Sequence, residues 1–425
     1  MKIKDSITLK DKKILLAVTG SIAAVKTPLL VSNLIKKGAK VRCVVTPSAS
    51  KLVSPLSLAT LSRNNCYQDK NQWDGSEPKP LHIALSEWAD IVVVAPLSAS
   101  SLSRWVNGLG DGLIASLLLA CEKPVIAAAA MNTGMWCNEG VKHNWDKLNK
   151  YKNVITLSPS NGLLACDRIG EGRMANPEII QLAIESAFLR IKSDKLINRD
   201  WEGLKLLISA GPTIEDLDPA RYLSNRSTGL TGILLGQVAR FRGASVDIVH
   251  GPLQVPENFS EGLNTYPIRS GKDMQKMLSK LQANSNAIAM TAAISDLRLK
   301  NCSNQKKLNK ESLIENLCGN FELVPDLLAE LGKNRPNGQI ILGFSALTGT
   351  DNEIKQLAIL KKSRKGCDLV FANPIDRPDQ GFESNLNEGW LVGAQDSLIT
   401  IPIDSKLSIA HLLLDEVLKL IKKQL

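Results

Sequence analysis

The sequence lacks several features that mark common protein classes. None of its eight cysteines forms a Cys-x-x-Cys pair, which argues against a zinc site and fits reduced thiols in a cytosol. The longest apolar run covers residues 112–121 and is too short to span a bilayer. Residues 1–13 have no apolar segment of the kind found in secretory signals. We therefore expect a cytoplasmic protein with no membrane partner and no metal site built from its own side chains.

Aromatic residues are also scarce, at 4% of the chain. The formal net charge is +10, but the basic residues are spread along the sequence rather than gathered in stripes. A protein that binds single-stranded nucleic acid would be expected to combine basic residues with aromatic rings. We therefore expect no nucleic-acid partner, and the positive charge favours anionic small molecules instead.

What the sequence does contain is one strand–turn–helix pattern used twice. The mainly apolar runs at 13–18 and 206–208 predict buried strands, and each is followed by a glycine-containing turn and an apolar-periodic segment. Second strands follow at 41–46 and 246–251, each after a Gly-Ala pair. With 425 residues the chain is long enough for two domains. The pattern predicts two open parallel-sheet α/β (Rossmann-like) domains in one chain.

Domain boundaries follow from a change in composition. Residues 191–201 are charged and lack a steady apolar period. We therefore predict a first domain at 1–190, a linker at 191–202 and a second domain at 203–425.

The glycine pattern bears on the choice of cofactor. Residues 20–25 read Gly-Ser-Ile-Ala-Ala-Val, and neither strand–turn–helix opening contains the Gly-x-Gly-x-x-Gly fingerprint of dinucleotide binding. A two-domain nicotinamide-dependent oxidoreductase is therefore an alternative, but a disfavoured one.

Polar residues follow several of the predicted strands of the first domain. All-apolar runs at 91–95 and 124–130 predict strands buried on both faces of a parallel sheet. Ligands of open α/β sheets bind beyond the carboxyl ends of the strands. The turns at 19–21, 96–100 and 131–132 are expected at that edge and so predict a binding site there.

Several motifs carry a resemblance to a known family. HIALSEWAD (82–90), AAMN (129–132) and LLACDRIGEGRM (163–174) resemble the active-site segments of flavin-dependent cysteine decarboxylases, the family of phosphopantothenoylcysteine decarboxylase. SAGPT (209–213) and RYLSNRSTG (221–229) extend the resemblance to the bacterial bifunctional phosphopantothenoylcysteine decarboxylase/phosphopantothenate–cysteine ligases of coenzyme A biosynthesis. The resemblance covers about residues 12–425 with the motifs in the right order.

The resemblance implies roles for three residues of the first domain. His82 would act as an acid/base, Asn132 would hold the substrate carboxylate, and Cys166 would supply a proton. Without the resemblance, a lone histidine, an asparagine after a strand and a single thiol are more often structural. Ala129 stands where the family has proline. The substrate cysteinyl thiol would be oxidised by the flavin, which makes loss of its carboxylate easy.

The family also implies an FMN site and a flap over the substrate. Gly170 and Gly172 predict that the flap is a flexible loop. Ser100 stands where the family has asparagine. The expected FMN contacts are Gly20, Ser21, Thr46, Ser98, Ser100 and Met131, and the expected substrate contacts on the flap are Arg173 and Met174.

For the second domain the resemblance implies a CTP-dependent ligase. CTP would activate the carboxylate of 4′-phosphopantothenate as an acyl-cytidylate, and the cysteine amine would then displace CMP. Asn225 would stabilise the acyl-nucleotide, and Lys307 or alternatively Lys310 would be the catalytic lysine. Mg²⁺ would bridge triphosphate oxygens with few protein ligands. Further expected contacts are Gly211, Asp218, Arg221, Ala293, Asp296, Lys310 and Phe344.

The second domain departs from the family pattern at three places. Leu230 replaces a lysine, Leu347 replaces a glutamate, and the usual lysine before Pro325 is absent. A non-catalytic flavin-binding regulator is a further alternative, since the decarboxylases have such relatives. The presence of His82, Asn132 and Cys166 together argues against it.

The resemblance finally implies an assembly. Decarboxylases of this family form trimers with FMN at subunit contacts, and the ligase domains pair as dimers. A chain with a threefold and a twofold contact closes into a particle of twelve subunits at the smallest. The expected homo-oligomer is a dodecamer, in which the apolar helix at 113–121 lies beside the FMN turn and His82 and Asn132 can be supplied across a contact.

Overall fold

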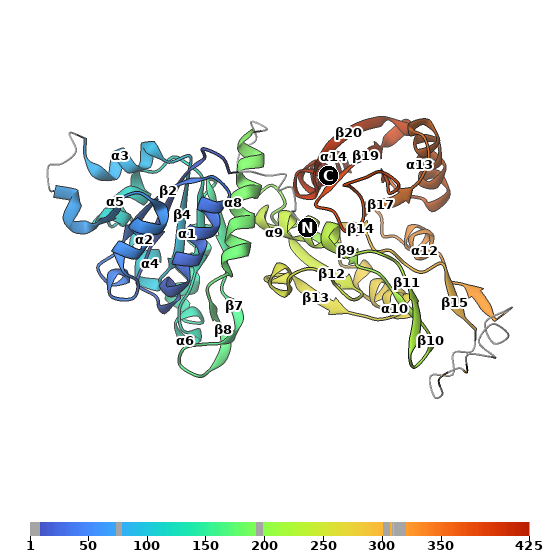
Figure 1. The fold of residues 1–425 in the computed structure, drawn as a ribbon, viewed down its shortest axis with the longest axis horizontal. Coiled ribbons are helices and arrows are strands. Elements are labelled where there is room, and N and C mark those ends of the chain that lie inside the picture. The colour runs from blue at the N-terminus through green and yellow to red at the C-terminus, as the bar shows by residue number, and fades with distance from the viewer. Residues whose placement is uncertain are drawn as a thin grey trace. The chain divides into compact units, whose positions relative to one another are not determined.

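The structure is a computed structural model that describes residues 9–73, 79–192, 199–300, 307, 309 and 320–424 (Figure 1). The described chain divides into two compact units, which meet in sequence between Asp200 and Trp201. We call them the N-terminal unit, residues 9–200, and the C-terminal unit, residues 201–424.

Parallel strands make the central sheet of the N-terminal unit. Its strands are β1 Lys13–Val18, β2 Lys40–Val45, β3 Cys66–Gln68, β4 Ile91–Leu97, β5 Val125–Ala129 and β6 Val154–Leu157. Their order across the sheet is β3-β2-β1-β4-β5-β6, so the direction of winding reverses between β1 and β4. Every residue of β4 is buried, because helices cover both faces of a doubly wound sheet.

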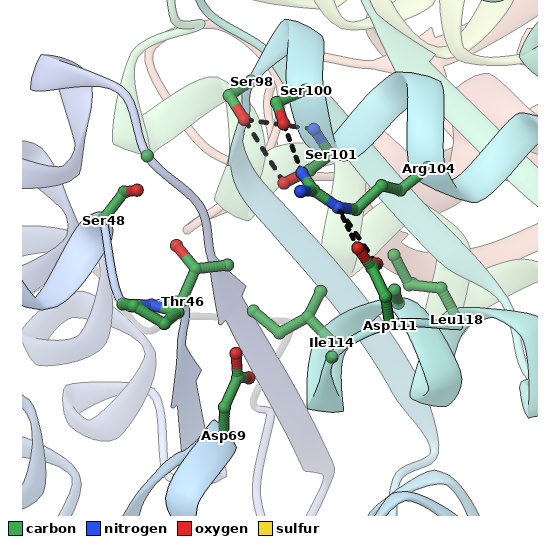
Figure 2. A pocket seen from close by; sticks show the side chains of 14 residues that line it. Thr46, Ser48, Asp69, Ser98, Ser100, Ser101, Arg104, Asp111, Ile114 and Leu118 are labelled. Carbon is green, nitrogen blue, oxygen red and sulfur yellow. Dashed lines mark hydrogen bonds and ion pairs between the residues drawn. The ribbon is translucent and has the colours of Figure 1, made fainter. Parts of the chain in front are cut away.

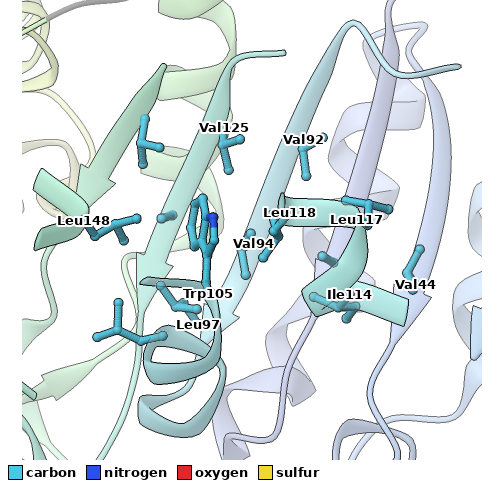
Figure 3. Packing of buried hydrophobic residues seen from close by; sticks show 14 of the residues in the cluster. Val44, Val92, Val94, Leu97, Trp105, Ile114, Leu117, Leu118, Val125 and Leu148 are labelled. Atoms are coloured by element: carbon cyan, nitrogen blue, oxygen red, sulfur yellow. The ribbon is translucent and has the colours of Figure 1, made fainter. Parts of the chain in front are cut away.

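Helices of this unit cover the sheet with apolar side chains. Figure 3 shows Ile114 and Leu117 near Val44, Val94 and other apolar side chains of the sheet, all in one buried cluster. The helices are η1 Ile22–Lys26, α1 Thr27–Lys36, η2 Ala49–Lys51, α2 Pro55–Ser62, η3 Asp69–Trp73, α3 Leu81–Trp88, α4 Ala99–Val106, α5 Leu113–Ala120, α6 Thr133–Trp136, α7 Glu139–Asn149 and α8 Pro177–Lys192. A two-stranded hairpin of β7 Ser160–Leu163 and β8 Ile169–Arg173 lies outside the main sheet.

Two local expectations from the sequence are wrong. The polar, proline- and glycine-containing composition of 64–80 predicts a loop, but residues 66–73 form the edge strand β3 and the 3-10 helix η3. His82 is predicted to lie in a polar loop next to a strand, but it lies in the first turn of helix α3. The helix forms because Leu81 and Leu85 recur four residues apart and are both buried, and because Pro80 precedes its first turn.

The C-terminal unit repeats the same winding order and extends it. Its main strands are β9 Lys205–Ala210, β12 Ser245–His250, β13 Asn264–Pro267, β14 Ala287–Met290, β17 Ile340–Leu347, β18 Leu369–Pro374, β19 Leu386–Val392 and β20 Leu398–Ser405. Their order is β13-β12-β9-β14-β17-β18-β19-β20, and β19 pairs antiparallel with both its neighbours. The prediction of two open parallel-sheet domains is therefore confirmed, with an antiparallel edge added to the second sheet.

Helices and two hairpins complete the C-terminal unit. The hairpins are β10 Ile214–Asp218 with β11 Arg221–Ser224, and β15 Leu297–Leu299 with β16 Phe321–Leu323. The helices are α9 Leu230–Phe241, η4 Glu257–Ser260, α10 Gly271–Gln282, α12 Leu327–Lys333, α13 Asp351–Lys365, η5 Ala394–Asp396 and α14 Lys406–Gln424. Helix α14 packs against α9. No helix in the described part of the chain has the length and apolar character needed to cross a membrane.

Described residues at both ends of the predicted linker, 191–202, belong to neighbouring structure. Helix α8 continues to Lys192, and Trp201 is fully buried in the C-terminal unit, where its backbone N–H donates to the carbonyl of Arg242 over 3.0 Å. The exact domain boundaries stay a prediction.

Candidate functional site

An open pocket lies at the carboxyl ends of β1, β2 and β4, where the winding of the first sheet reverses. It encloses about 820 Å³ of empty space that opens to solvent. Four of the six predicted cofactor contacts line it: Gly20, Thr46, Ser98 and Ser100. Ser21 and Met131 lie on adjoining turns and are not among the lining residues.

Buried Thr19 fixes the geometry of this strand edge. Its hydroxyl donates to the carbonyl of Pro96 over 2.7 Å and accepts from the backbone N–H of Ser98 over 2.8 Å. Gly20 follows directly, and a Cβ there would lie only 2.7 Å from Cβ of Ser48. Glycine is therefore required where the β1 and β2 turns approach each other, and this approach shapes the pocket.

The pocket has a polar side and an apolar side (Figure 2). Arg104 Nε donates to both carboxylate oxygens of Asp111 at 3.0 Å, and its guanidinium also contacts the hydroxyl of Ser100. Ile114 and Leu118 of α5 supply the apolar part of the lining. This combination suits a ligand with an apolar ring system and an anionic tail.

Asn132 and Cys166 are brought together although they are 34 residues apart in sequence. Asn132 follows β5 and caps α6, where its Oδ1 accepts from the backbone N–H of Gly134 over 2.8 Å. Its Nδ2 donates to Sγ of Cys166 over 3.2 Å. Cys166 is exposed in the turn between β7 and β8. Two predicted catalytic residues therefore form one polar pair at the carboxyl edge of the sheet.

The flap that carries Cys166 is a hairpin fastened to the end of β5, so the expectation of a flexible loop is wrong for β8. The backbone N–H of Met131 donates to the carbonyl of Gly172 over 3.1 Å. A Cβ at Gly172 would lie 2.3 Å from the carbonyl oxygen of Met131, and one at Gly170 would lie 2.6 Å from Oγ1 of Thr133. These glycines permit close packing of the hairpin rather than looseness. At the end of β8, Arg173 is half-buried and Met174 is buried.

His82 does not join this pair within one copy of the chain. It lies on α3, at the upper left of the N-terminal unit in Figure 1, whereas the β7–β8 hairpin lies at its lower right. Its Nδ1 is buried and no described residue forms a hydrogen bond with it. The structure therefore assembles the predicted decarboxylase residues only in part.

A second pocket lies at the carboxyl edge of the C-terminal sheet. It borders the first turn of α9 and the ends of β14, β17 and β18, and encloses about 630 Å³ of empty space that opens to solvent. The predicted contacts Ala293 and Phe344 line it. Gly232 in the first turn of α9 lies so close to β14 that a Cβ would be 2.5 Å from Oγ1 of Thr291. Gly211 lies behind this turn, with its backbone N 3.3 Å from the position of a Cβ on Gly229.

Asn225 lies at the end of β11 and reaches the same pocket rim. Its Nδ2 donates to the carbonyls of Ala293 and Ile294 over 3.1 and 3.0 Å. Asp218 and Arg221 form an ion pair of 3.4 Å at the far end of the β10–β11 hairpin. None of Asp218, Arg221 and Asn225 is among the residues that line the pocket, but Asn225 bonds the carbonyl of Ala293, which does line it.

The predicted Asp296 and Lys307 of the ligase site are not among the residues that line this pocket. Asp296 is exposed beyond β14, and Lys307 is also exposed. Lys310 lies outside the described residues. The choice between Lys307 and Lys310 therefore stays open.

Sequence reasoning missed two lysines of α13. Lys361 Nζ donates to the carbonyl of Phe344 over 2.9 Å and to the hydroxyl of Ser345 over 3.2 Å. Burial lowers the pKa of Lys361, and the nearby charge of Asp296 partly offsets this. Lys365 pairs with Asp326. The basic run at 361–365 was visible in the sequence, but only the fold shows that Lys361 bonds the carbonyl of Phe344, a residue that lines the pocket.

Metal ligands can be assessed only among the described residues. There, no group of three or more histidine, cysteine, aspartate or glutamate side chains is arranged to hold a metal ion.

Known proteins similar to this chain fall into one family. A Flavoprotein family model matches residues 3–189, and the model of the DNA/pantothenate metabolism flavoprotein C-terminal domain matches residues 201–421. The coenzyme A biosynthesis bifunctional protein CoaBC of Bacillus subtilis is 32% identical over 98% of each chain. Its counterpart in Borreliella burgdorferi is 33% identical over 97% of this chain and 99% of the relative. The chain belongs to this coenzyme A biosynthesis bifunctional family.

Solved structures resemble each half of this family member. The C-terminal domain of a coenzyme A biosynthesis bifunctional protein CoaBC is 24% identical, covers 53% of this chain and all of the other, and has a TM-score of 0.43. A PPC decarboxylase mutant complexed with pantothenoylaminoethenethiol is 33% identical, covers 44% of this chain and all of the other, and has a TM-score of 0.39.

Membership in the family establishes the broad activity. The chain is a bifunctional enzyme of coenzyme A biosynthesis, with a flavoprotein decarboxylase half followed by a ligase half. The alternatives of a nicotinamide-dependent oxidoreductase and a non-catalytic regulator find no support among these relatives.

Proposed function

We propose that the N-terminal unit decarboxylates 4′-phosphopantothenoylcysteine with FMN held in the pocket of Figure 2. The residues present fit this cofactor. Gly20 keeps the space beside Ser48 open, the hydroxyls of Ser98 and Ser100 can donate to phosphate oxygens, and Ile114 offers an apolar surface to the ring system. When bound, the flavin supplies oxidation of the cysteinyl thiol and later returns the electrons.

The pairing of Asn132 with Cys166 carries this part of the proposal. The bond from the backbone N–H of Gly134 to Oδ1 holds the amide of Asn132 in place, and the second N–H of its Nδ2 can donate to a substrate carboxylate. Cys166 then lies beside the same substrate carbon chain and delivers a proton from Sγ. Arg173 and Met174 are proposed to line the substrate at the end of the hairpin, and Met131 to support the flavin.

The proposed role of His82 requires a second copy of the chain. Because α3 and the hairpin lie apart within one unit, His82 would act on a substrate held by Asn132 and Cys166 of another copy. We propose the corresponding threefold contact, which together with a twofold ligase contact gives a dodecamer. Light scattering tests this, and a monomeric, flavin-loaded protein would contradict it.

For the C-terminal unit we propose CTP-dependent condensation of 4′-phosphopantothenate with cysteine. The first turn of α9 presents backbone N–H groups to a phosphate at the pocket, as helix N-termini do in other nucleotide sites. Asn225 Nδ2 bonds the carbonyl of Ala293, which lines the pocket, and that of Ile294, and it would exchange one of these bonds for a bond to the acyl-cytidylate. Asp296 is proposed to bind the nucleotide and Lys307 or Lys310 to be the catalytic cation, while Mg²⁺ would need few protein ligands and would neutralise charge on the triphosphate. Gly211 would support the phosphate turn, and Asp218 with Arg221 the pantothenate end.

One incubation tests both halves of the proposal. The purified protein is given 4′-phosphopantothenate, cysteine, CTP and Mg²⁺, and the products are followed by mass. We expect phosphopantothenoylcysteine first and phosphopantetheine second. Omission of CTP should abolish both products, whereas supplied phosphopantothenoylcysteine should still be decarboxylated. Formation of neither product would overturn the proposal.

A further inference from the structure

Lys406 is a buried cation in the second pocket. It is the first residue of α14, it lines the pocket together with Phe344, Asn373 and Phe382, and only 5% of its surface is exposed. The catalytic scheme proposed above makes no use of it.

The charge of Lys406 is poorly compensated by the protein. Its Nζ donates to the backbone carbonyl of Gly381 over 2.8 Å, and among the described residues it has no carboxylate partner. An ammonium group has three N–H donors, so this contact leaves donors to spare. Burial lowers its pKa to about 8. A buried charge without a counter-ion costs stability, which is difficult to explain if its only role is to hold the Gly381 turn.

The surroundings of Lys406 are those of an anion site. Helix α14 packs along α9, and both helices begin at the carboxyl edge of the sheet. Helix α14 follows β20, which runs the same way as β18, and the first turn of α9 lies against Ala210 and Thr291 at the ends of β9 and β14. Both helix N-termini border the same pocket, at Gly229–Gly232 and at Lys406. The positive ends of two helix dipoles add to the charge of Lys406. Leu230, the first residue of α9, also lines the pocket where the family pattern has a lysine.

We propose that Lys406 binds a phosphate oxygen of the nucleotide. It supplies from α14 the positive charge that α9 lacks because its first residue is Leu230. The ammonium keeps its bond to the Gly381 carbonyl and donates a second hydrogen bond to the triphosphate. This makes Lys406 a binding residue for the anionic part of the substrate rather than for its base. The inference rests on the proposed binding of CTP in this pocket.

The experiment compares Lys406→Met with the unchanged full-length protein. Methionine fills similar space without a charge, and Lys422→Met, which removes an exposed charge from the same helix, serves as the matched control. Affinities for CTP, for cytidine and for inorganic triphosphate are measured by titration calorimetry with Mg²⁺ present. We expect Lys406→Met to weaken CTP and triphosphate at least tenfold and to leave cytidine unchanged. Lys422→Met should change none of the three.

The outcomes separate this inference from the proposed function. If the unchanged protein does not bind CTP, the proposed function fails. If it binds CTP and Lys406→Met binds CTP equally well, only the role of Lys406 is overturned. An equal loss for CTP and cytidine would also overturn it, because that result indicates a contact with the nucleoside or a general distortion of the pocket.

Two further readouts guard against misfolding. Thermal melting of Lys406→Met should occur at the same temperature or higher, since the substitution removes a buried charge, and a lower melting temperature together with lost cytidine binding would indicate a structural lysine. Between pH 7 and 9 the CTP affinity of the unchanged protein should fall as Lys406 loses its proton. In Lys406→Met this fall should be smaller, and an identical pH profile would contradict the proposal.

Discussion

The two units of this enzyme each have six parallel strands in the same order. They differ in whether the cation at the carboxyl edge of the sheet is paired with a carboxylate. In the N-terminal pocket the cation, Arg104, is held by both oxygens of Asp111 and is partly exposed. In the C-terminal pocket the cation, Lys406, is buried and bonds a backbone carbonyl. A neutralised cation can position a cofactor that stays bound, whereas an uncompensated one gains most when an anionic substrate arrives. The shared sheet topology therefore determines where ligands bind, and the residues that follow the strands determine which ligand is bound.

The two units differ also in how complete their sites are. In the C-terminal unit Phe344 and Ala293 line one pocket, and their backbone carbonyls accept hydrogen bonds from Lys361 and Asn225. In the N-terminal unit, His82 lies apart from the Asn132–Cys166 pair. The comparison predicts that substitutions in either unit affect one reaction and spare the other.

The largest effect is expected for Cys166→Ser. A serine hydroxyl is a far weaker acid than a thiol, so decarboxylation should fall about 100-fold or more while flavin absorbance and ligation stay unchanged. The enzyme assay with supplied phosphopantothenoylcysteine measures this. Cys137→Ser, which replaces another exposed thiol of the same unit, is the control and should retain full activity. Full turnover by Cys166→Ser would disprove the assigned role.

Asn225→Ala should produce the reciprocal effect. Loss of the donor at the pocket rim should slow ligation about 100-fold, with decarboxylation unchanged. The measurement is the rate of phosphopantothenoylcysteine formation from CTP. Asn284→Ala, at an exposed asparagine of the same unit, should behave like the unchanged protein. Equal loss of both activities would show that the two units are not functionally separate.

Gly20→Ala should weaken flavin binding by about tenfold. The added methyl group would overlap Cβ of Ser48 and force the turn to shift, and such overpacking costs roughly 1–3 kcal/mol. Fluorescence titration of apoprotein with FMN measures the change. At Gly110 the nearest side-chain atom to an added Cβ is 3.5 Å away, so Gly110→Ala should bind flavin normally. Similar affinities for the two variants would contradict the assigned role of the Gly20 turn.

The last prediction concerns stability and its dependence on pH. Burial lowers the pKa of Lys406 from 10.5 in the unfolded chain to about 8 in the folded protein. Between these two pH values the unfolded chain therefore binds more protons than the folded protein. As a result, the contribution of Lys406 to the free energy of unfolding rises with pH in this range. Lys406→Met should therefore be more stable than the unchanged protein at pH 7, by an amount on the order of 3 kcal/mol, and the advantage should shrink toward pH 10. Denaturant unfolding of the C-terminal unit at both pH values measures this, and a difference independent of pH would contradict the assignment.

The sequence predicted the parts of the molecule that depend on local patterns. The apolar runs of β1, β4, β5 and β9 and the motifs around Asn132 and Cys166 were sufficient to predict strands, sheet edge and chemistry. The antiparallel strands β19 and β20 and the lysines at 361 and 406 were not foreseen. Their positions depend on contacts between distant segments, and a lysine in a mixed sequence looks the same whether it is buried or exposed.

The contacts that hold the β7–β8 hairpin, which carries Cys166, against the end of β5 affect how substrate and product enter and leave. The bond from Met131 to Gly172 and the tight packing of Gly170 on Thr133 hold the β8 side at the end of β5. Leu163 and Ile169, at the tip, are 63% and 79% exposed. Bending is therefore confined to the tip, whose apolar side chains can leave water when they close on a bound molecule. We expect product to leave when the turn between β7 and β8 moves, without disturbing the end of β5 or Asn132 at the start of α6.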